Sequence, residues 1–358
     1  MQTKQKKVVV GLSGGVDSSV VALLLKLQNF DVVGLHMKTE NITTQAEDEQ
    51  RVRDICKKIG IDCHFVEYDD QMQIVKDYFV KEYLDGRTPN PCVVCNREVK
   101  FNPFIEYANK IGADYFATGH YAQIEHRDGL HYLKTAVDDK KDQSYFLCQL
   151  SQSQFEKALF PLGSFTKDEV RKIAKENGFD FDNIKESQDI CFLGSQKFKD
   201  FMAENYPEKP GNIIDEKTNQ IVGKHNGISK YTIGQRKGLG IGGGFGETGE
   251  CWFVSKKDVK NNIIYVAQGN NNILYSDALI CNNFNWIPKK PRDNEFECMA
   301  KFRYRQSPQK VKVVIINENS IRVEFAEKQK AVTIGQYVVL YQDDKCLGGG
   351  TIDEIIKL

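Results

Sequence analysis

Short apolar runs alternate with helically spaced segments over the first half of the chain. The apolar runs have the length of buried strands, at residues 8–10, 31–36, 64–66 and 114–117. The segments between them are helix-like: a continuous apolar run at 20–25, and apolar positions that recur every three or four residues at 45–59 and 71–84. This order predicts a parallel sheet covered by helices, with ligands bound at the carboxyl ends of the strands.

The second half of the chain has a different pattern. After Pro207 and Pro210, short alternating runs separated by Gly, Asn and Asp replace the helical spacing. A weaker break lies near residues 269–272, and the runs after it have the strand spacing of a small barrel. We therefore expect an α/β domain, a β-rich central domain and a C-terminal β-barrel, over residues 1–205, 206–270 and 271–358.

The junction between the first strand and the first helix has the composition of a phosphate-binding loop. It comprises Gly11, Leu12, Ser13, Gly14, Gly15, Val16, Asp17 and Ser18. Glycines after a strand let the backbone turn sharply, and the N–H groups at the start of the next helix attract an anion. The Gly-Lys-Ser/Thr ending of the Walker loop is absent, so another nucleotide chemistry is implied. The alternative is a tight turn that binds nothing.

Residues 13–18 resemble the signature of the PP-loop ATP pyrophosphatases, which cleave ATP between its α and β phosphates. The resemblance implies ATP with Mg²⁺, and Asp17 can hold a cation. Met37 follows the second strand and Gly119 the fourth, so both are expected at the same edge of the sheet as the loop. We expect Met37 to cover the adenine ring, although a core methionine would give the same pattern.

The chain has no net charge that would draw it to a polyanion. Its 358 residues include 49 Lys and Arg and 49 Asp and Glu, so a nucleic-acid site has to come from a local cluster. Residues 301–312 hold five basic residues and no acidic one, interleaved with aromatics. Bases can stack on Tyr304 while Arg303 binds phosphate. A solvated strand face is the alternative.

The chain begins with a short polar stretch and has no run approaching the roughly 20 apolar residues of a membrane span. We expect a cytoplasmic protein whose ten cysteines stay reduced. Seven of them fall within helical or strand-like runs and are expected to be small buried hydrophobes: Cys56, Cys63, Cys148, Cys251, Cys281, Cys298 and Cys346.

The other three cysteines carry the candidate sulfur chemistry. Cys92 and Cys95 form a CxxC pair on an expected loop, and Cys191 follows 96 residues after Cys95. Exposure, the neighbouring Arg97 and a helix start favour a reactive thiolate. Structural zinc needs a fourth ligand, which no second CxxC or nearby histidine pair supplies. Three thiols suit either a nucleophile with a disulfide partner or a [4Fe–4S] cluster with one open iron.

Motifs along nearly the whole chain resemble those of the tRNA-specific 2-thiouridylases, in the same order. The matching segments are residues 11–18, 88–91, 95–96, 119–122, 141–147, 187, 189–192, 231–239, 303–306 and 335–336. The resemblance implies a PP-loop domain, similar to the adenine nucleotide alpha-hydrolases, in a tRNA-uridine 2-sulfurtransferase. Such an enzyme adenylates the C2 oxygen of the wobble uridine, position 34 of the tRNA, and sulfur then replaces that oxygen.

The resemblance also implies roles for the matching residues. Cys191 would carry a persulfide, and Cys95 would release its sulfur by closing a disulfide with Cys191. Residues 11–18, Met37 and Gly119 would hold ATP. The tRNA would be contacted by Asn90, Pro91 and Cys92 at the target base, and elsewhere by His120, Lys141, Asp142, Gln143, Arg303, Tyr304 and Gln336. A cysteine desulfurase or a sulfur-relay protein would deliver sulfur to what we expect to be a monomer.

One position departs from the family pattern. Many members carry Asp where this chain has Cys92, and a carboxylate beside the target base is a candidate general acid or base. A thiol replaces it poorly near neutral pH. Cys92, Cys95 and Cys191 together suit a [4Fe–4S] cluster whose free iron binds sulfide, in place of the persulfide and disulfide. Both routes stay open.

Two other functions fit parts of the sequence. PP-loop proteins also include synthetases that amidate small molecules, but those need an ammonia source, and this chain has no glutaminase-sized extra domain. The β-rich half could also be a binding module tethered to an unrelated enzyme. Pyrophosphate release with and without tRNA separates these functions. The glycine-rich stretch 240–246 is expected to be a mobile loop.

Overall fold

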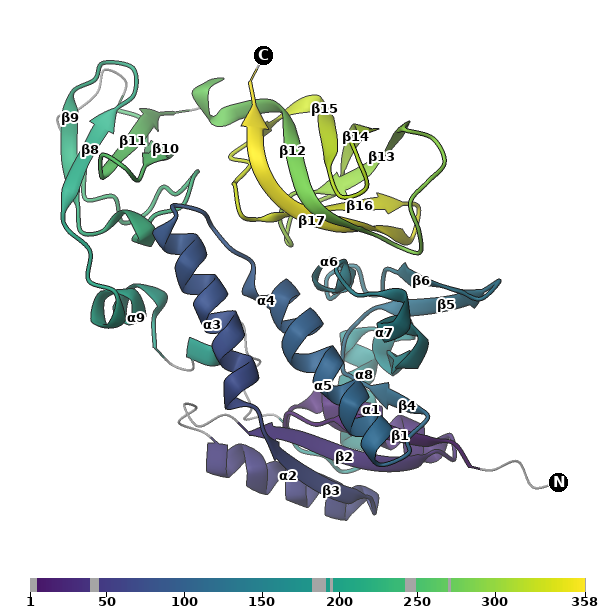
Figure 1. Ribbon diagram of the computed structural model, residues 1–358. Helices are drawn as coiled ribbons and strands as arrows, with labels where there is room; N and C mark the ends of the chain where they lie inside the picture. The colour runs from purple at the N-terminus through teal and green to yellow at the C-terminus, as the bar shows by residue number, and fades with distance from the viewer. Residues whose placement is uncertain are drawn as a thin grey trace.

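Figure 1 shows a computed structural model of the protein, which describes residues 5–38, 45–181, 191–193, 196–241, 249–269 and 272–357. A helical part built on a sheet lies at the bottom of the view, a barrel of strands, coloured green to yellow, lies above it, and a small β-rich part lies to the left of the barrel. Residues 242–246 of the glycine-rich stretch, and residues 187, 189 and 190 of the family motifs, lie outside the described residues.

A five-stranded sheet forms the core of the N-terminal part, and its strands run parallel in the order β3-β2-β1-β4-β7. Val8, Val9 and Val10 of β1 are fully buried, as expected of a strand covered on both faces. The predicted parallel α/β architecture is therefore confirmed. The strands are β1 (Lys7–Gly11), β2 (Asp31–Lys38), β3 (Asp62–Glu67), β4 (Tyr115–Ala117) and β7 (Ala158–Leu159).

Helices surround this sheet, and local sequence signals set several of their ends. Thr166 and Glu169 form a capping box at the start of α8, as their spacing predicts. No helix in the described part of the chain combines the length and apolarity needed to cross a membrane. The helices are α1 (Val16–Leu27), α2 (Gln45–Ile59), α3 (Asp69–Leu84), α4 (Pro91–Val94), η1 (Cys95–Phe101), α5 (Asn102–Lys110), α6 (Ser144–Leu147), α7 (Gln152–Lys157), η2 (Pro161–Ser164), α8 (Lys167–Glu176), η3 (Cys191–Leu193) and α9 (Phe198–Asn205).

The central part is a four-stranded sheet in the order β10-β11-β8-β9. Ile213, Val254, Ile264 and Val266 form its fully buried core, so this part has an apolar cluster of its own. Its elements are β8 (Gly211–Asp215), β9 (Ile221–His225), η4 (Ile228–Lys230), β10 (Trp252–Asp258) and β11 (Ile263–Gln268). The predicted β-rich central domain is confirmed.

The C-terminal part is a closed antiparallel barrel, as the strand spacing predicts. Its strands follow the order β12-β15-β14-β13-β16-β17, and pairing of β12 with β17 closes the ring. It is preceded by η5 (Asn272–Leu274) and consists of β12 (Tyr275–Trp286), β13 (Glu295–Lys301), β14 (Gln309–Ile315), β15 (Ile321–Lys330), β16 (Tyr337–Gln342) and β17 (Lys345–Ile356).

A hairpin of the N-terminal part extends the barrel sheet. It comprises β5 (Gln123–Arg127) and β6 (Leu130–Lys134), and β6 pairs with β17 where Leu133 lies opposite Cys346. One apolar cluster contains residues of both parts, including Tyr145 and Tyr337. The barrel is therefore packed directly on the part of the chain that carries the glycine loop. The domain boundaries at residues 205 and 270 stay a prediction.

Candidate functional site

The glycine loop between β1 and α1 is held in one conformation by its own serines. Gly14 has φ of +80°, a value that favours glycine, and Gly15 caps the helix with extended backbone. The Ser13 N–H donates to the Ser18 hydroxyl at 3.2 Å, and that hydroxyl donates to the Gly15 carbonyl at 3.2 Å. The loop thus presents a sharp turn at a helix N-terminus, which is the geometry that binds phosphate.

The structure brings Gly119 against this loop. A Cβ added to Gly119 would lie 3.2 Å from the Asp17 Cβ and 3.3 Å from the Ser18 nitrogen, so the close approach depends on glycine. Met37 lies at the carboxyl end of β2 and is partly buried against an apolar cluster. Met37 therefore lies on β2 and Gly119 two residues past the end of β4, and these two strands flank β1 at the edge where the loop begins.

A lysine that sequence reasoning missed lies beside the loop. The Lys167 ammonium is 2.8 Å from both carboxylate oxygens of Asp17, and the Tyr121 hydroxyl donates to one of them at 2.8 Å. The Lys167 side chain is only 7% exposed, although it is the first residue of α8. The capping box predicted the start of α8, but no local signal predicted that this helix begins beside Asp17.

His120 is buried next to the loop. Its side chain is 8% exposed, its Nδ1 lies 2.8 Å from the Thr118 hydroxyl, and its ring packs near those of Phe101 and Phe160. Burial, aided by the Lys100 charge, lowers the pKa of His120 well below its usual value. The imidazole is therefore neutral at neutral pH.

Asp142 and Gln143 of the 141–143 motif form hydrogen bonds within the N-terminal part of the protein. The buried Asp142 carboxylate accepts from the Ser144 hydroxyl at 2.9 Å, and burial raises the pKa of Asp142. Gln143 accepts the Tyr121 N–H at 2.9 Å and donates its own N–H to the Tyr121 carbonyl at 2.8 Å. Lys141 is half-buried. The motif therefore fixes the segment that follows Gly119, and its predicted contacts with tRNA stay a prediction.

The CxxC pair lies on a helix, which corrects the expectation of a loop. Asn90 caps α4 and Pro91 occupies its first turn, where the fixed φ of proline favours a helix start. The helix then continues directly into η1 and α5, with no residue between these elements. Cys92 is exposed, whereas Cys95 is 5% exposed. Asn90 and Pro91 therefore begin a helix, where a loop was expected.

The segment of Cys191 approaches Cys95. The Cys191 backbone begins η3, and the two residues that follow, Phe192 and Leu193, pack in the same apolar cluster as Cys95. The Cys191 side chain lies outside the described residues. Among the described side chains, no three cysteine, histidine or acidic residues gather as a metal site. The two thiol-bearing segments, 96 residues apart in sequence, therefore share one cluster.

Most of the other cysteines are buried as expected, and one is not. Cys56, Cys148, Cys281, Cys298 and Cys346 are buried, and Cys63 is half-buried. Cys251 is exposed, so its assignment as a buried hydrophobe was wrong. It immediately precedes β10, which begins at Trp252, and therefore lies outside the sheet that would have covered it.

The barrel holds the loop that leads to Asn90. The Gln336 amide nitrogen donates to the Thr88 carbonyl at 2.9 Å and to the Pro89 carbonyl at 3.1 Å, and the Thr88 N–H donates to the Ile334 carbonyl at 2.9 Å. The Asn90 side chain in turn bonds the Tyr145 hydroxyl. Gln336 was predicted to contact tRNA, and its amide here positions the segment predicted to contact the target base.

Arg303 and Tyr304 lie where the barrel meets the N-terminal part. Arg303 is exposed, while the Tyr304 ring packs on that of Phe146 with centroids 4.3 Å apart. Arg303 borders a cavity of about 140 Å³ between all three parts of the chain. The cavity is lined by Thr88, Thr232, Ile233, Phe302, Arg303, Gln306, Lys330, Ala331, Val332, Thr333 and Gln336.

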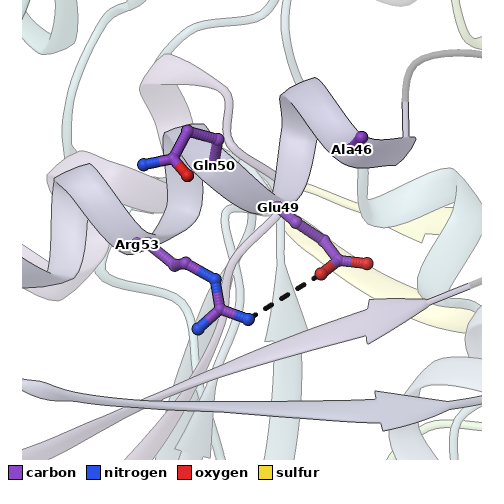
Figure 2. Close-up of a pocket in the computed structure, with 4 residues that line it drawn as sticks. All are labelled: Ala46, Glu49, Gln50 and Arg53. Atoms are coloured by element: carbon purple, nitrogen blue, oxygen red, sulfur yellow. Dashed lines mark ion pairs between the residues drawn. The ribbon is translucent and has the colours of Figure 1, made fainter.

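A second hollow, of about 360 Å³, lies on the surface of α2 and was not predicted. Ala46, Glu49, Gln50 and Arg53 line it (Figure 2). Arg53 and Glu49 form an ion pair at 3.9 Å, and the Arg53 guanidinium lies 4.0 Å above the Phe65 ring. Its charged groups are therefore already paired with one another and with β3.

Comparison with known proteins places the three parts in one family pattern. Family models described as the tRNA methyl transferase HUP domain, the tRNA methyl transferase PRC-barrel domain and the aminomethyltransferase beta-barrel domain match residues 6–195, 199–268 and 276–352. Proteins named tRNA-specific 2-thiouridylase MnmA from Bacillus cereus and Bacillus cytotoxicus are each 48% identical to the chain over 361 aligned positions. Each alignment covers 99% of this chain and 96% of the relative.

Among solved structures, the U34-tRNA thiolase NcsA from Methanococcus maripaludis with its [4Fe–4S] cluster is 21% identical, with a TM-score of 0.36. The match covers 53% of this chain and 63% of that one. This likeness is too distant to bear on the chemistry of the present chain.

Proposed function

Because the chain belongs to the tRNA-specific 2-thiouridylase family, we propose that it replaces the C2 oxygen of uridine 34 in tRNA with sulfur, in an ATP-dependent reaction. The enzyme is a tRNA-uridine 2-sulfurtransferase. One observation supports a shared site for nucleotide and sulfur: the segment 143–146 is bonded to both. Hydrogen bonds lead from Asp17 in the glycine loop through Tyr121 to Gln143. At the other end of the segment, the side chain of Asn96, next to Cys95, donates to the Phe146 carbonyl at 3.1 Å.

The first step would be adenylation of the uridine. The C2 oxygen attacks the α phosphorus of ATP, the bond from that phosphorus to the β-phosphate oxygen breaks, and pyrophosphate leaves. The N-terminus of α1 and the Lys167 ammonium supply positive charge for the phosphates, and Asp17 supplies a carboxylate that can hold Mg²⁺. The oxygen at C2 then becomes part of AMP, which is a good leaving group.

The second step would transfer sulfur from a Cys191 persulfide. Its terminal sulfur attacks C2, and AMP leaves with the former C2 oxygen. The Cys95 thiolate then attacks the Cys191 sulfur, which releases 2-thiouridine and closes a Cys95–Cys191 disulfide. A thiol reductant supplies the two electrons that reopen this disulfide. The packing of Cys95 with Phe192 and Leu193 supports such a pairing.

The alternative is a [4Fe–4S] cluster held by Cys92, Cys95 and Cys191. Cys92 is exposed and Cys95 is buried one helical turn further on, so this pair fits ligation at the boundary between solvent and an apolar cluster. A cluster held by three cysteines leaves one iron open, and that iron can bind sulfide. Because the persulfide route uses only two of the three thiols, Cys92 favours the cluster.

Formation of 2-thiouridine tests the proposal directly. Protein purified without oxygen is incubated with ATP, tRNA and one of two sulfur sources. Sulfide serves the cluster route, and a cysteine desulfurase with cysteine delivers persulfide sulfur for the Cys191 route. The nucleosides are analysed by mass spectrometry. We expect product from the wild type and from Cys251→Ser, a control at an exposed thiol of the central part, and a loss of at least about 100-fold in Cys95→Ser. Absence of product from the wild type, or full activity in Cys95→Ser, would overturn the proposal.

A further inference from the structure

Helix α2 places Arg51 beside the glycine loop. A Cβ added to Gly14 would lie 3.6 Å from the Arg51 Nε and 3.5 Å from the Asp48 carbonyl oxygen. Helix α2 therefore packs close against the turn at Gly14. The same half of α2 is tied to the end of β2, where the Lys38 ammonium lies 3.2 Å from Glu49. The N-terminal half of α2 therefore flanks the phosphate-binding turn.

The Arg51 guanidinium is only partly satisfied. Its Nη2 donates to the Asp48 carboxylate, whereas its Nε is buried without a hydrogen-bond partner among the described residues. A buried donor without an acceptor is unfavourable, and a guanidinium presents its N–H groups as a rigid fork. The side of Arg51 next to Gly14 is thus suited to an acceptor that enters the loop from outside.

The ligand class follows from the charge of the loop. Residues 11–18 contain one acidic residue and no basic one, yet the turn has the geometry of an anion site. Two cationic side chains lie beside the loop: the Lys167 ammonium, which pairs with Asp17, and the Arg51 guanidinium, which pairs with Asp48 on α2. We propose that Arg51 binds the β and γ phosphates of ATP, which leave as pyrophosphate. This inference rests on the proposed ATP-dependent function.

The chain offers a matched control on the same helix. Arg53 lies two residues further along α2, which turns its side chain about 200° around the helix from Arg51. Its guanidinium packs over Phe65 and pairs with Glu49 in the hollow shown in Figure 2. Arg53→Gln therefore removes the same charge from the same helix without touching the turn at Gly14.

Binding of ATP, AMP and pyrophosphate to the full chain, measured by titration calorimetry with Mg²⁺, tests the inference. Loss of a charge-assisted hydrogen bond of about 1.5–3 kcal/mol corresponds to about 10- to 100-fold in affinity. We expect Arg51→Gln to weaken ATP and pyrophosphate by that factor and to leave AMP unchanged. Arg51→Lys should keep part of the affinity, and Arg53→Gln should bind all three ligands like the wild type.

Different failures have different meanings. Equal ATP affinity in Arg51→Gln and the wild type overturns the role of Arg51, and so does an equal loss for ATP and AMP. If Arg53→Gln weakens ATP binding as much as Arg51→Gln, the loss reflects the net charge of α2 and not a contact of Arg51, and the inference is also overturned. If the wild type binds neither ATP nor pyrophosphate, the proposed ATP-dependent function itself fails. Thermal unfolding of each variant shows that it is folded.

Discussion

The Lys167 ammonium lies 2.8 Å from both carboxylate oxygens of Asp17, although 150 positions separate the two residues in the sequence. Asp17 lies in the glycine loop and in the first turn of α1, and Lys167 is the first residue of α8. This ion pair therefore joins the N-termini of these two helices. The Lys167 side chain is nearly buried, which strengthens its field at the loop. The pair therefore places a fixed cation where the loop itself has none.

Removing that cation should slow adenylation. Lys167→Met leaves the phosphates of ATP without a nearby ammonium, and the loss of one such stabilising group lowers a rate by about 100-fold. We expect this loss in tRNA-dependent release of pyrophosphate. Lys172→Met, on the same helix but 74% exposed, should retain the wild-type rate. A Lys167→Met protein that is folded and releases pyrophosphate at the wild-type rate would contradict the role of this lysine.

The barrel and the loop before Asn90 meet at Gly335, where no side chain fits. Gly335 has φ of +90°, and an added Cβ would lie 2.9 Å from the Thr88 nitrogen. We expect Gly335→Ala to lower the free energy of unfolding by more than about 1–3 kcal/mol, the range for backbone strain alone. Gly60→Ala, with φ of +73° and open space around the Cβ, should show the strain alone. Equal losses in urea unfolding of the two variants would argue against the contact.

Much of the fold could be predicted from the sequence because its signals are local. The continuous apolar run at 8–10 indicated a buried parallel strand, and Thr166 with Glu169 indicated the start of α8. The CxxC segment was assigned wrongly, since Pro91 can either extend a loop or begin a helix. Only packing of the following residues against an apolar cluster decides between these two conformations.

The site was predictable only where its residues form motifs. The glycine loop and the thiols stand in short recognisable segments, whereas Lys167 and Arg51 reach the loop from separate helices. Their placement depends on how α8 and α2 pack, which no spacing in the sequence encodes. Similarly, the use of the Gln336 amide to hold Thr88 and Pro89 depends on how the barrel docks.

Burial of His120 should make folding stability depend on pH. The pKa of His120 lies well below its usual value near 6.5, so below pH 6.5 the unfolded chain binds more protons than the folded one. The free energy of unfolding should therefore fall as the pH drops below about 6.5. His36 and His225 shift in the same direction, so the wild type must be compared with His120→Gln. A pH dependence between 7.5 and 5.5 that is the same in both proteins would contradict the prediction.

The exposed Arg303 should contribute to tRNA binding without affecting ATP. It borders the cavity between the three parts of the chain, so its guanidinium can reach a phosphate at that junction. We expect Arg303→Ala to weaken tRNA binding about tenfold. The slope of the logarithm of the binding constant against the logarithm of the salt concentration should become shallower by about one. Arg292→Ala, on another exposed segment of the C-terminal part, serves as the control. Equal losses of tRNA and ATP binding in Arg303→Ala would argue against a local contact.

Cys92 should decide the route of the sulfur. It is exposed one helical turn before the buried Cys95. The persulfide route gives its thiol no step in sulfur transfer, whereas a cluster needs a third thiolate besides Cys95 and Cys191. We expect protein purified without oxygen to contain about four iron and four acid-labile sulfide per chain. Cys92→Ser should lose most of both, while Cys251→Ser keeps them, because both thiols are exposed but only Cys92 lies beside Cys95. A colourless, iron-free wild type that thiolates tRNA fully would exclude the cluster and leave the Cys95–Cys191 disulfide route.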